Sequence, residues 1–121
     1  MTEVILKEVN KNFGNSTVIN DVSIKIKEGD FCVIVGPSGC GKSTLLRIIA
    51  GLETPTSGSI IINSKDVTTV DPANRGIGMV FQNYALYPHM TVEENMSFGL
   101  RMNNAPKTMI KKKVGEAAKI L

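Results

Sequence analysis

Cysteine, histidine and long apolar runs are all scarce in this sequence of 121 residues. The two cysteines, Cys32 and Cys40, suggest neither a disulfide framework nor a metal cluster, so a reducing environment is the simpler expectation. The single histidine, His89, has no carboxylate spacing around it that indicates a catalytic triad or a metal site. No apolar run reaches the roughly 18 residues of a transmembrane helix, and the start of the chain lacks the apolar region of a signal peptide.

What is present is the composition of an ordinary globular protein, with 42% hydrophobic and 21% charged residues. The length favours a single domain, and no internal repeat or low-complexity segment is visible. The net charge of +3 is mild, and the excess of lysine lies near the C-terminal end. Charge pattern alone favours a solvated helix face there over a patch for nucleic acid or lipid. The lysines of this cluster are Lys107, Lys111, Lys112, Lys113 and Lys119.

The most informative stretch covers residues 30–51. Its continuous apolar run at 31–35 predicts a strand that is buried on both faces, as in a parallel sheet. A glycine-rich loop then leads into a helix that begins near Lys42, and Gly51 is a natural stop for that helix. The order strand, loop and helix is the context in which a phosphate-binding loop is expected.

The loop itself matches the pattern G-x-x-x-x-G-K-[ST], with Lys42 and Ser43 at its end. Glycine lets the backbone turn its N–H groups inward around phosphate oxygens, and the N-terminus of the helix adds positive potential. Lys42 is suited to bridge the β- and γ-phosphates of ATP, and the hydroxyl of Ser43 is suited to ligate Mg²⁺. The candidate nucleotide-binding residues of the loop are Gly36, Pro37, Ser38, Gly39, Cys40, Gly41, Lys42, Ser43 and Thr44.

Cys40 allows two interpretations within this loop. A helix N-terminus lowers the pKa of a nearby thiol, which would make Cys40 reactive. Alternatively, cysteine is simply a small side chain that fits at this position. The sequence favours neither interpretation over the other.

The rest of the chain is expected to be rich in strands up to about residue 82 and helical afterwards. A turn-rich break is expected at 11–15, between the first two strands, and the second strand alternates as a half-buried antiparallel strand does. Thr91 and Glu94 form a capping box at the start of a helix. The expected strands are Glu3–Val9, Thr17–Ile26, Ser59–Ile62 and Ile77–Phe81, and a last helix is expected over Lys107–Leu121.

Two stretches resemble the ATP-binding subunits of ABC transporters, in the sugar-importer group of the maltose and glycerol-3-phosphate import type. They are GPSGCGKSTLLRIIAGLETPTSG at 36–58 and RGIGMVFQNYALYPHMTVEENMSFGL at 75–100. The resemblance extends over nearly the whole chain. It implies an α/β fold: a P-loop NTPase core with an antiparallel β subdomain, truncated at the start of the helical subdomain. The implied division is 1–88 for the core and 89–121 for the beginning of the helical subdomain.

The same resemblance assigns roles to residues outside the loop. Gln82 corresponds to the Q-loop glutamine, whose amide can offer an oxygen to Mg²⁺ and a hydrogen bond toward the attacking water. Gln82 and Lys42 are therefore the candidate catalytic residues, and Gln82 and Ser43 are the candidate metal ligands. Phe13 is placed like the aromatic residue that stacks on adenine, although the family usually has Tyr or Trp there. The implied partner-facing residues after Gln82 include Tyr84, Tyr87, Pro88 and His89.

Three motifs of the family are absent up to residue 121. They are the LSGGQ signature, the apolar strand that ends in Asp-Glu, and the switch histidine. The chain therefore resembles the N-terminal half of an ATP-binding subunit. Because the carboxylates that polarise the attacking water are missing, little or no turnover is expected of this chain alone.

The resemblance implies an ATPase whose ATP binding and hydrolysis drive import of a sugar or related small solute. Its partners would be ATP, Mg²⁺, a second copy of the full-length subunit, and permease subunits at the cytoplasmic face of the membrane, with peripheral attachment and no nucleic acid. Two alternatives stay open. One is a soluble ABC-type ATPase acting on nucleic acid or ribosomes, supported only by the terminal lysines. The other is a non-catalytic nucleotide-binding module.

Overall fold

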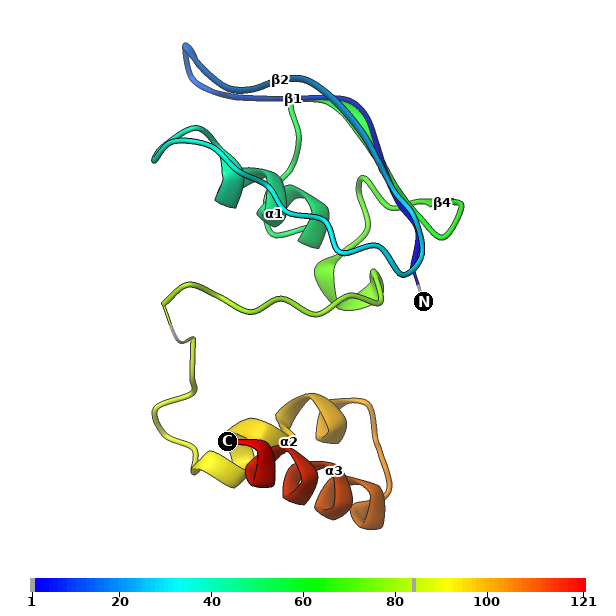
Figure 1. Ribbon diagram of the computed structural model, residues 1–121, viewed down its shortest axis with the longest axis vertical. Helices are drawn as coiled ribbons and strands as arrows, with labels where there is room; N and C mark the ends of the chain where they lie inside the picture. Colours follow the sequence, from blue (N-terminus) through cyan, green and yellow to red (C-terminus); the bar gives the residue numbers. More distant parts are fainter. Residues whose placement is uncertain (1, 84) are drawn as a thin grey trace. The chain divides into compact units, whose positions relative to one another are not determined.

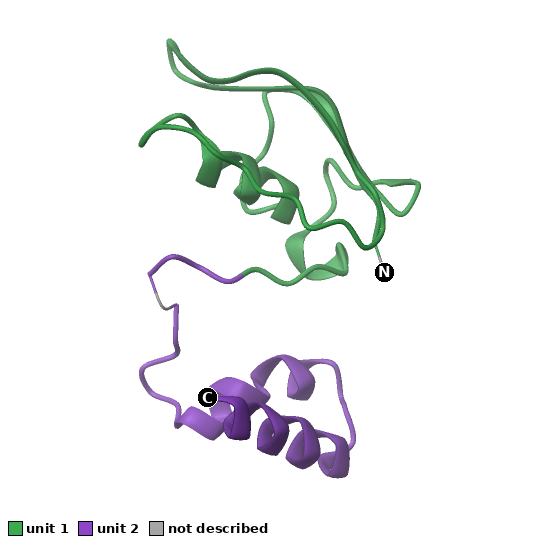
Figure 2. Ribbon diagram, in the orientation of Figure 1, with its two compact units in different colours: residues 1–79 green, residues 80–121 purple. Residues whose placement is uncertain are grey.

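The computed structural model describes residues 2–83 and 85–121, and these residues form two compact units. The first unit ends at Met79, and the second comprises Val80–Leu121 (Figure 2). Strands occur only in the first unit within the described ranges, and the second unit contains two helices. The division into 1–88 and 89–121 that the resemblance implies stays a prediction.

The first unit is built on an antiparallel sheet of order β2-β1-β3-β4. Its two long strands, β1 (Val4–Phe13) and β2 (Ser16–Ile26), form a twisted ribbon that Figure 1 shows in blue. β3 (Ser57–Ile62) pairs with the other edge of β1, and the short β4 (Lys65–Asp66) pairs with β3. The expected antiparallel strands are thus present, but the break expected at 11–15 is wrong. β1 continues to Phe13, and only Gly14 and Asn15 make the turn.

Helix α1 (Lys42–Ala50) packs against this sheet. Leu45 and Ile48 point from it into the core, and Ile48 is fully buried. Burying a side chain of this size contributes roughly 2 kcal/mol to folding. The helix begins at Lys42 and ends in a left-handed Gly51 with φ of 80°, as the sequence predicts. The buried cluster consists of Leu6, Val9, Ile19, Leu45, Ile48, Ile60, Ile62 and Val67.

The two remaining strands that the sequence predicts, 31–35 and 77–81, are not formed. Phe31 is 93% exposed and Val80 is 98% exposed, so neither run is buried on both faces. Only Ile34 and Ile77 pack partly against the core. A strand needs a neighbour that accepts and donates its backbone hydrogen bonds, and no described residue forms a ladder with either run. An apolar sequence by itself cannot supply that neighbour.

Between β4 and the second unit, a single turn of 3-10 helix, η1 (Pro72–Asn74), leads to Arg75. The second unit contains α2 (Val92–Met102) and α3 (Lys107–Ile120), which pack on each other. The capping box is present: the Thr91 N–H donates to Glu94 Oε2 at 2.7 Å, and the Glu94 N–H donates to Thr91 Oγ1 at 3.2 Å. No helix in the described ranges is long and apolar enough to cross a membrane.

Candidate functional site

The loop at 36–41 has backbone angles that favour glycine at two positions. Gly39 has φ of 80° and Gly41 has φ of 95°, both in the left-handed region that L side chains rarely adopt. Gly41 also lies against β2, so that a Cβ there would stand 2.8 Å from the carbonyl oxygen of Val18. Glycine at 41 therefore satisfies two independent requirements, the left-handed backbone angle and the close approach to β2.

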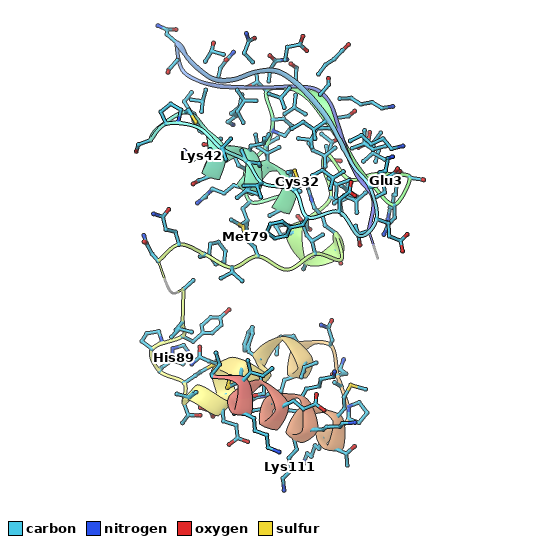
Figure 3. All side chains as sticks on the ribbon, in the orientation of Figure 1. Glu3, Cys32, Lys42, Met79, His89 and Lys111 are labelled. Carbon is cyan, nitrogen blue, oxygen red and sulfur yellow. The ribbon has the colours of Figure 1, made fainter. Side chains whose placement is uncertain are left out.

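Lys42 lies at the first position of α1, where Figure 3 labels it. Its ammonium donates hydrogen bonds to the carbonyl oxygens of Gly36 and Pro37 at 2.8 and 2.7 Å. It also lies 3.7 Å from the Sγ atom of Cys40. The lysine thus folds back over its own loop, and the positive charge stands where the helix N-terminus already favours an anion.

Phe13 shares a pocket of about 290 Å³ with this loop. The ring comes from the end of β1, across the turn that leads into β2, and it is half exposed. The sheet therefore brings an aromatic side chain to the start of α1 although 28 positions separate Phe13 from Gly41 (41 − 13). The other residues that line this pocket are Val18, Gly39, Gly41, Lys42, Ser43 and Thr44.

Lys11 makes three contacts near Phe13 that sequence patterns do not indicate. The Lys11 ammonium stands 4.7 Å from the centroid of the Phe13 ring. It also forms an ion pair with Glu53 Oε1 at 2.7 Å and donates to the carbonyl oxygen of Thr54 at 2.7 Å. The hydrogen bond from Lys11 holds the pKa of the Glu53 carboxyl below its ordinary value. The period-2 alternation of a strand could have placed Lys11 and Phe13 on one face, had β1 been expected to extend so far.

Arg75 is the second feature that sequence reasoning missed. This buried guanidinium donates to the carbonyl oxygens of Ile48 and Ile49 in the last turn of α1, both at 3.0 Å. It also reaches the carbonyl oxygens of Val70 and Thr68, at 2.8 and 3.1 Å. Burial lowers the pKa of Arg75, but an arginine stays cationic at neutral pH. Arg75 therefore holds the C-terminal end of α1, the helix whose other end carries the glycine-rich loop.

The remaining candidate residues lie elsewhere. Gln82 belongs to the second unit and is exposed in a turn. Cys32 and Cys40 are both exposed free thiols, so the burial expected for Cys32 is wrong for the same reason as the strand around it. Tyr84 lies outside the described residues. In the ranges 2–83 and 85–121, no group of three or more His, Cys, Asp or Glu side chains could hold a metal ion.

The second unit has a pocket of its own after Gln82. It has a volume of about 430 Å³, and its lining is mostly apolar, including Leu86, Pro88 and Met96. Asn95 fixes one wall, because its side chain accepts from the Tyr87 N–H at 2.8 Å and donates to the Tyr87 carbonyl at 3.1 Å. The ring of His89 meets the edge of Tyr87, with centroids 6.0 Å apart.

A glycine-rich loop between an antiparallel sheet and a helix that starts with Lys-Ser defines the class of this protein. The chain belongs to the ABC transporter family, whose model matches residues 19–121. The membership and fold class predicted from the sequence are thereby confirmed.

Within this family, the chain is similar to the ATP-binding proteins of two importers. The sn-glycerol-3-phosphate import ATP-binding protein UgpC of Bordetella avium is 56% identical over 122 residues, and the match covers 100% of this chain and 34% of the relative. The maltose/maltodextrin import ATP-binding protein MalK of Escherichia coli K12 is 54% identical over 121 residues, with 100% and 33% covered. The chain thus spans about a third of the length of these curated relatives.

Solved structures agree with the family. One is a dimeric structure of a post-hydrolysis state of the ATP-binding cassette MJ0796 bound to ADP and Pi. It superposes with a TM-score of 0.83 and 34% identity, covering 96% of this chain and 56% of that one. A nucleotide-free ATP-binding cassette from an ABC transporter has a TM-score of 0.71 and 35% identity, covering 82% and 40%.

Proposed function

We propose that this chain is the nucleotide-binding part of an ABC import ATPase, which binds Mg-ATP at the pocket between Phe13 and the loop at 36–44. The observation that carries the proposal is that pocket. It brings together an aromatic ring, a glycine-rich turn and the N-terminus of α1, with Lys42 and Ser43 on its wall. The import relatives support the wider assignment to ATP-driven uptake of a sugar or related solute.

The loop residues would divide the work of holding a triphosphate. Backbone N–H groups from Ser38 through Thr44 would face the phosphate oxygens, and the left-handed glycines support that orientation. Lys42 would leave the carbonyl oxygens of Gly36 and Pro37 and pair with the phosphates, exchanging neutral acceptors for anionic ones. Phe13 would stack on adenine with one face of its ring.

The metal assignment follows from the donor set. Ser43 lines the pocket, and its hydroxyl would hold Mg²⁺. The family resemblance alone supports Gln82 as a further ligand through its amide oxygen. Bound there, Mg²⁺ neutralises phosphate charge and so favours phosphoryl transfer. No residue lining this pocket is acidic. We therefore expect this chain to bind ATP with little turnover, and to need the carboxylates of the full-length subunit for hydrolysis.

The exposed pocket after Gln82 supports the expected permease contact. Its lining is largely apolar and comes from residues 86–96 together with Leu121. An apolar hollow of this kind fits a short helix from a membrane subunit, which would attach the full-length protein peripherally to the cytoplasmic face of the membrane. The nucleic-acid alternative rests on the lysines of α3 alone, and no described contact adds to it.

Nucleotide binding is tested by isothermal titration calorimetry, in which Mg-ATP is titrated into the 121-residue chain. The affinity of the wild type is compared with that of Lys42→Ala. Lys112→Ala is the matched control, because it removes the same charge from an exposed position on α3. We expect Lys42→Ala to weaken binding by at least about tenfold, since a charge-assisted contact to phosphate is lost. Lys112→Ala should bind like the wild type. Equal affinity in Lys42→Ala would contradict the proposal, and brisk release of phosphate by the wild type would contradict the expected lack of turnover.

A further inference from the structure

The Phe13 ring is held by a charged contact on one side. The Lys11 ammonium lies 4.7 Å from the ring centroid, within the range of a cation–π interaction. Two oxygens anchor that ammonium: Glu53 Oε1 and the carbonyl oxygen of Thr54, each at 2.7 Å. The Lys11 side chain is only 12% exposed and that of Glu53 is 25% exposed, so solvent screens this pair less than it screens a surface ion pair.

The contact with Lys11 matters because the aromatic residue at position 13 is a phenylalanine. Its ring has no hydroxyl or N–H group that could fix its orientation through a hydrogen bond. Phe13 is also the last residue of β1 and is 48% exposed, so side-chain packing constrains the ring only in part. The fixed cation can restrict the ring to one orientation.

The anchor also lies just beyond the helix that begins at the glycine-rich loop. Glu53 is the third residue after the end of α1 at Ala50, and its N–H donates to the carbonyl oxygen of Arg47 at 3.2 Å. Backbone hydrogen bonds therefore connect Glu53 to the last turn of α1, the helix that begins at Lys42. Lys11 joins the ring of Phe13 to the end of that helix, and so sets the ring relative to the residues that line the rest of the pocket.

We propose that Lys11, held by Glu53, is a positioning residue for base recognition: it orients the Phe13 ring for stacking on the nucleotide base. This inference rests on the proposed function, since it assigns a role within the same pocket. It predicts that Lys11 contributes to the affinity for the base and not to the affinity for the phosphates.

The test compares two ligands, Mg-ATP and magnesium inorganic triphosphate, which has the phosphates without the base. Lys11→Met keeps the aliphatic stem and removes the charge, and Lys11→Arg keeps a cation. We expect Lys11→Met to weaken Mg-ATP binding by about threefold to tenfold, and triphosphate binding by less than twofold. Lys11→Arg should recover most of the ATP affinity.

A ring-dependence control completes the design. In a Phe13→Leu background, Lys11→Met should cause no additional loss of ATP affinity, because there is no ring to orient. If circular dichroism shows that Lys11→Met does not fold, Glu53→Gln is used in its place, because it removes the anchor and keeps the ammonium. The same result is expected: a larger loss of affinity for Mg-ATP than for triphosphate.

The outcomes separate the two proposals. Equal losses for ATP and triphosphate, no loss for either, or an undiminished loss in the Phe13→Leu background would overturn the positioning role. Those results leave the proposed function standing as long as Lys42→Ala weakens both ligands. Failure of the wild type to bind either ligand would overturn the proposed function, and this inference with it.

Discussion

Lys11 and Glu53 form an ion pair between the end of β1 and the loop that follows α1. Such pairs contribute little when both side chains are in water, but these two are largely shielded. Lys11 lies in the stretch 11–15, where the sequence predicts a turn-rich break. No local rule links residues 42 positions apart, so this contact becomes visible only once the sheet and the helix are folded together.

The acid side of the stability profile should depend on Glu53. Its pKa in the folded protein is below the ordinary value of 4.5, chiefly through the hydrogen bond from Lys11. The folded state therefore takes up this proton less readily than the unfolded chain does. The stability that the carboxylate contributes is present above pH 4.5 and is lost as the pH falls through the folded-state pKa.

Chemical denaturation measured at pH 7 and at several values below 4.5 checks this expectation. Glu53→Gln should be less stable than the wild type at pH 7, and the difference should shrink as the pH falls. Glu116→Gln, an exposed site on α3, is the control and should follow the wild-type profile. A constant difference between Glu53→Gln and the wild type at every pH would contradict the assignment.

At the scale of single elements, local signals predicted the helices well. The start of α1 at Lys42, its stop at Gly51 and the capping box of α2 all appear as expected. The ends of a helix depend on hydrogen bonds within about four residues, so they can be predicted from the sequence. The runs at 31–35 and 77–81 did not form strands, because a strand depends on a partner that may lie anywhere in a chain.

Removing the cap of α2 should loosen the first turn of that helix. Thr91→Ala deletes the oxygen that accepts the Glu94 N–H, and a lost cap of this kind costs about 1 kcal/mol. Amide hydrogen exchange of residues 93–96 should accelerate by about fivefold, which corresponds to that energy. Thr91→Ser retains the oxygen and should stay close to the wild type. If the serine variant exchanges as fast as the alanine variant, the cap is not what protects this turn.

At the scale of the whole molecule, the described residues form two units with different sources of stability. The first has a buried cluster drawn from β1, β2, β3 and α1, and the Arg75 side chain ties α1 to the segment 68–75. In the second, Ser97 is the one described helix residue that is buried. A substitution in one unit should therefore change the stability of that unit and leave the stability of the other unchanged.

Arg75→Met tests that independence. Loss of the guanidinium removes its hydrogen bonds to the partly buried carbonyl oxygens of Val70 and Thr68, at a cost of about 1–3 kcal/mol for each group left unsatisfied. The carbonyl oxygen of Ile48 keeps the Gly51 N–H as a donor. Amides of β1 and α1 should exchange faster, and those of α3 should not change. Gly115→Ala should do the reverse and slow exchange in α3 alone, because a helical glycine costs about 1 kcal/mol relative to alanine. Parallel changes in both units after either substitution would show that they unfold together.

The sequence by itself determined the glycine-rich loop, the starts and stops of the helices and the family, since each rests on a motif or on contacts between near neighbours. Tertiary structure alone decided that Lys11 and Glu53 meet at the Phe13 ring and that Arg75 closes the end of α1. It also decided that the most apolar runs remain largely exposed. Hydrophobicity makes burial favourable, but only a neighbouring surface with matching hydrogen bonds can provide it.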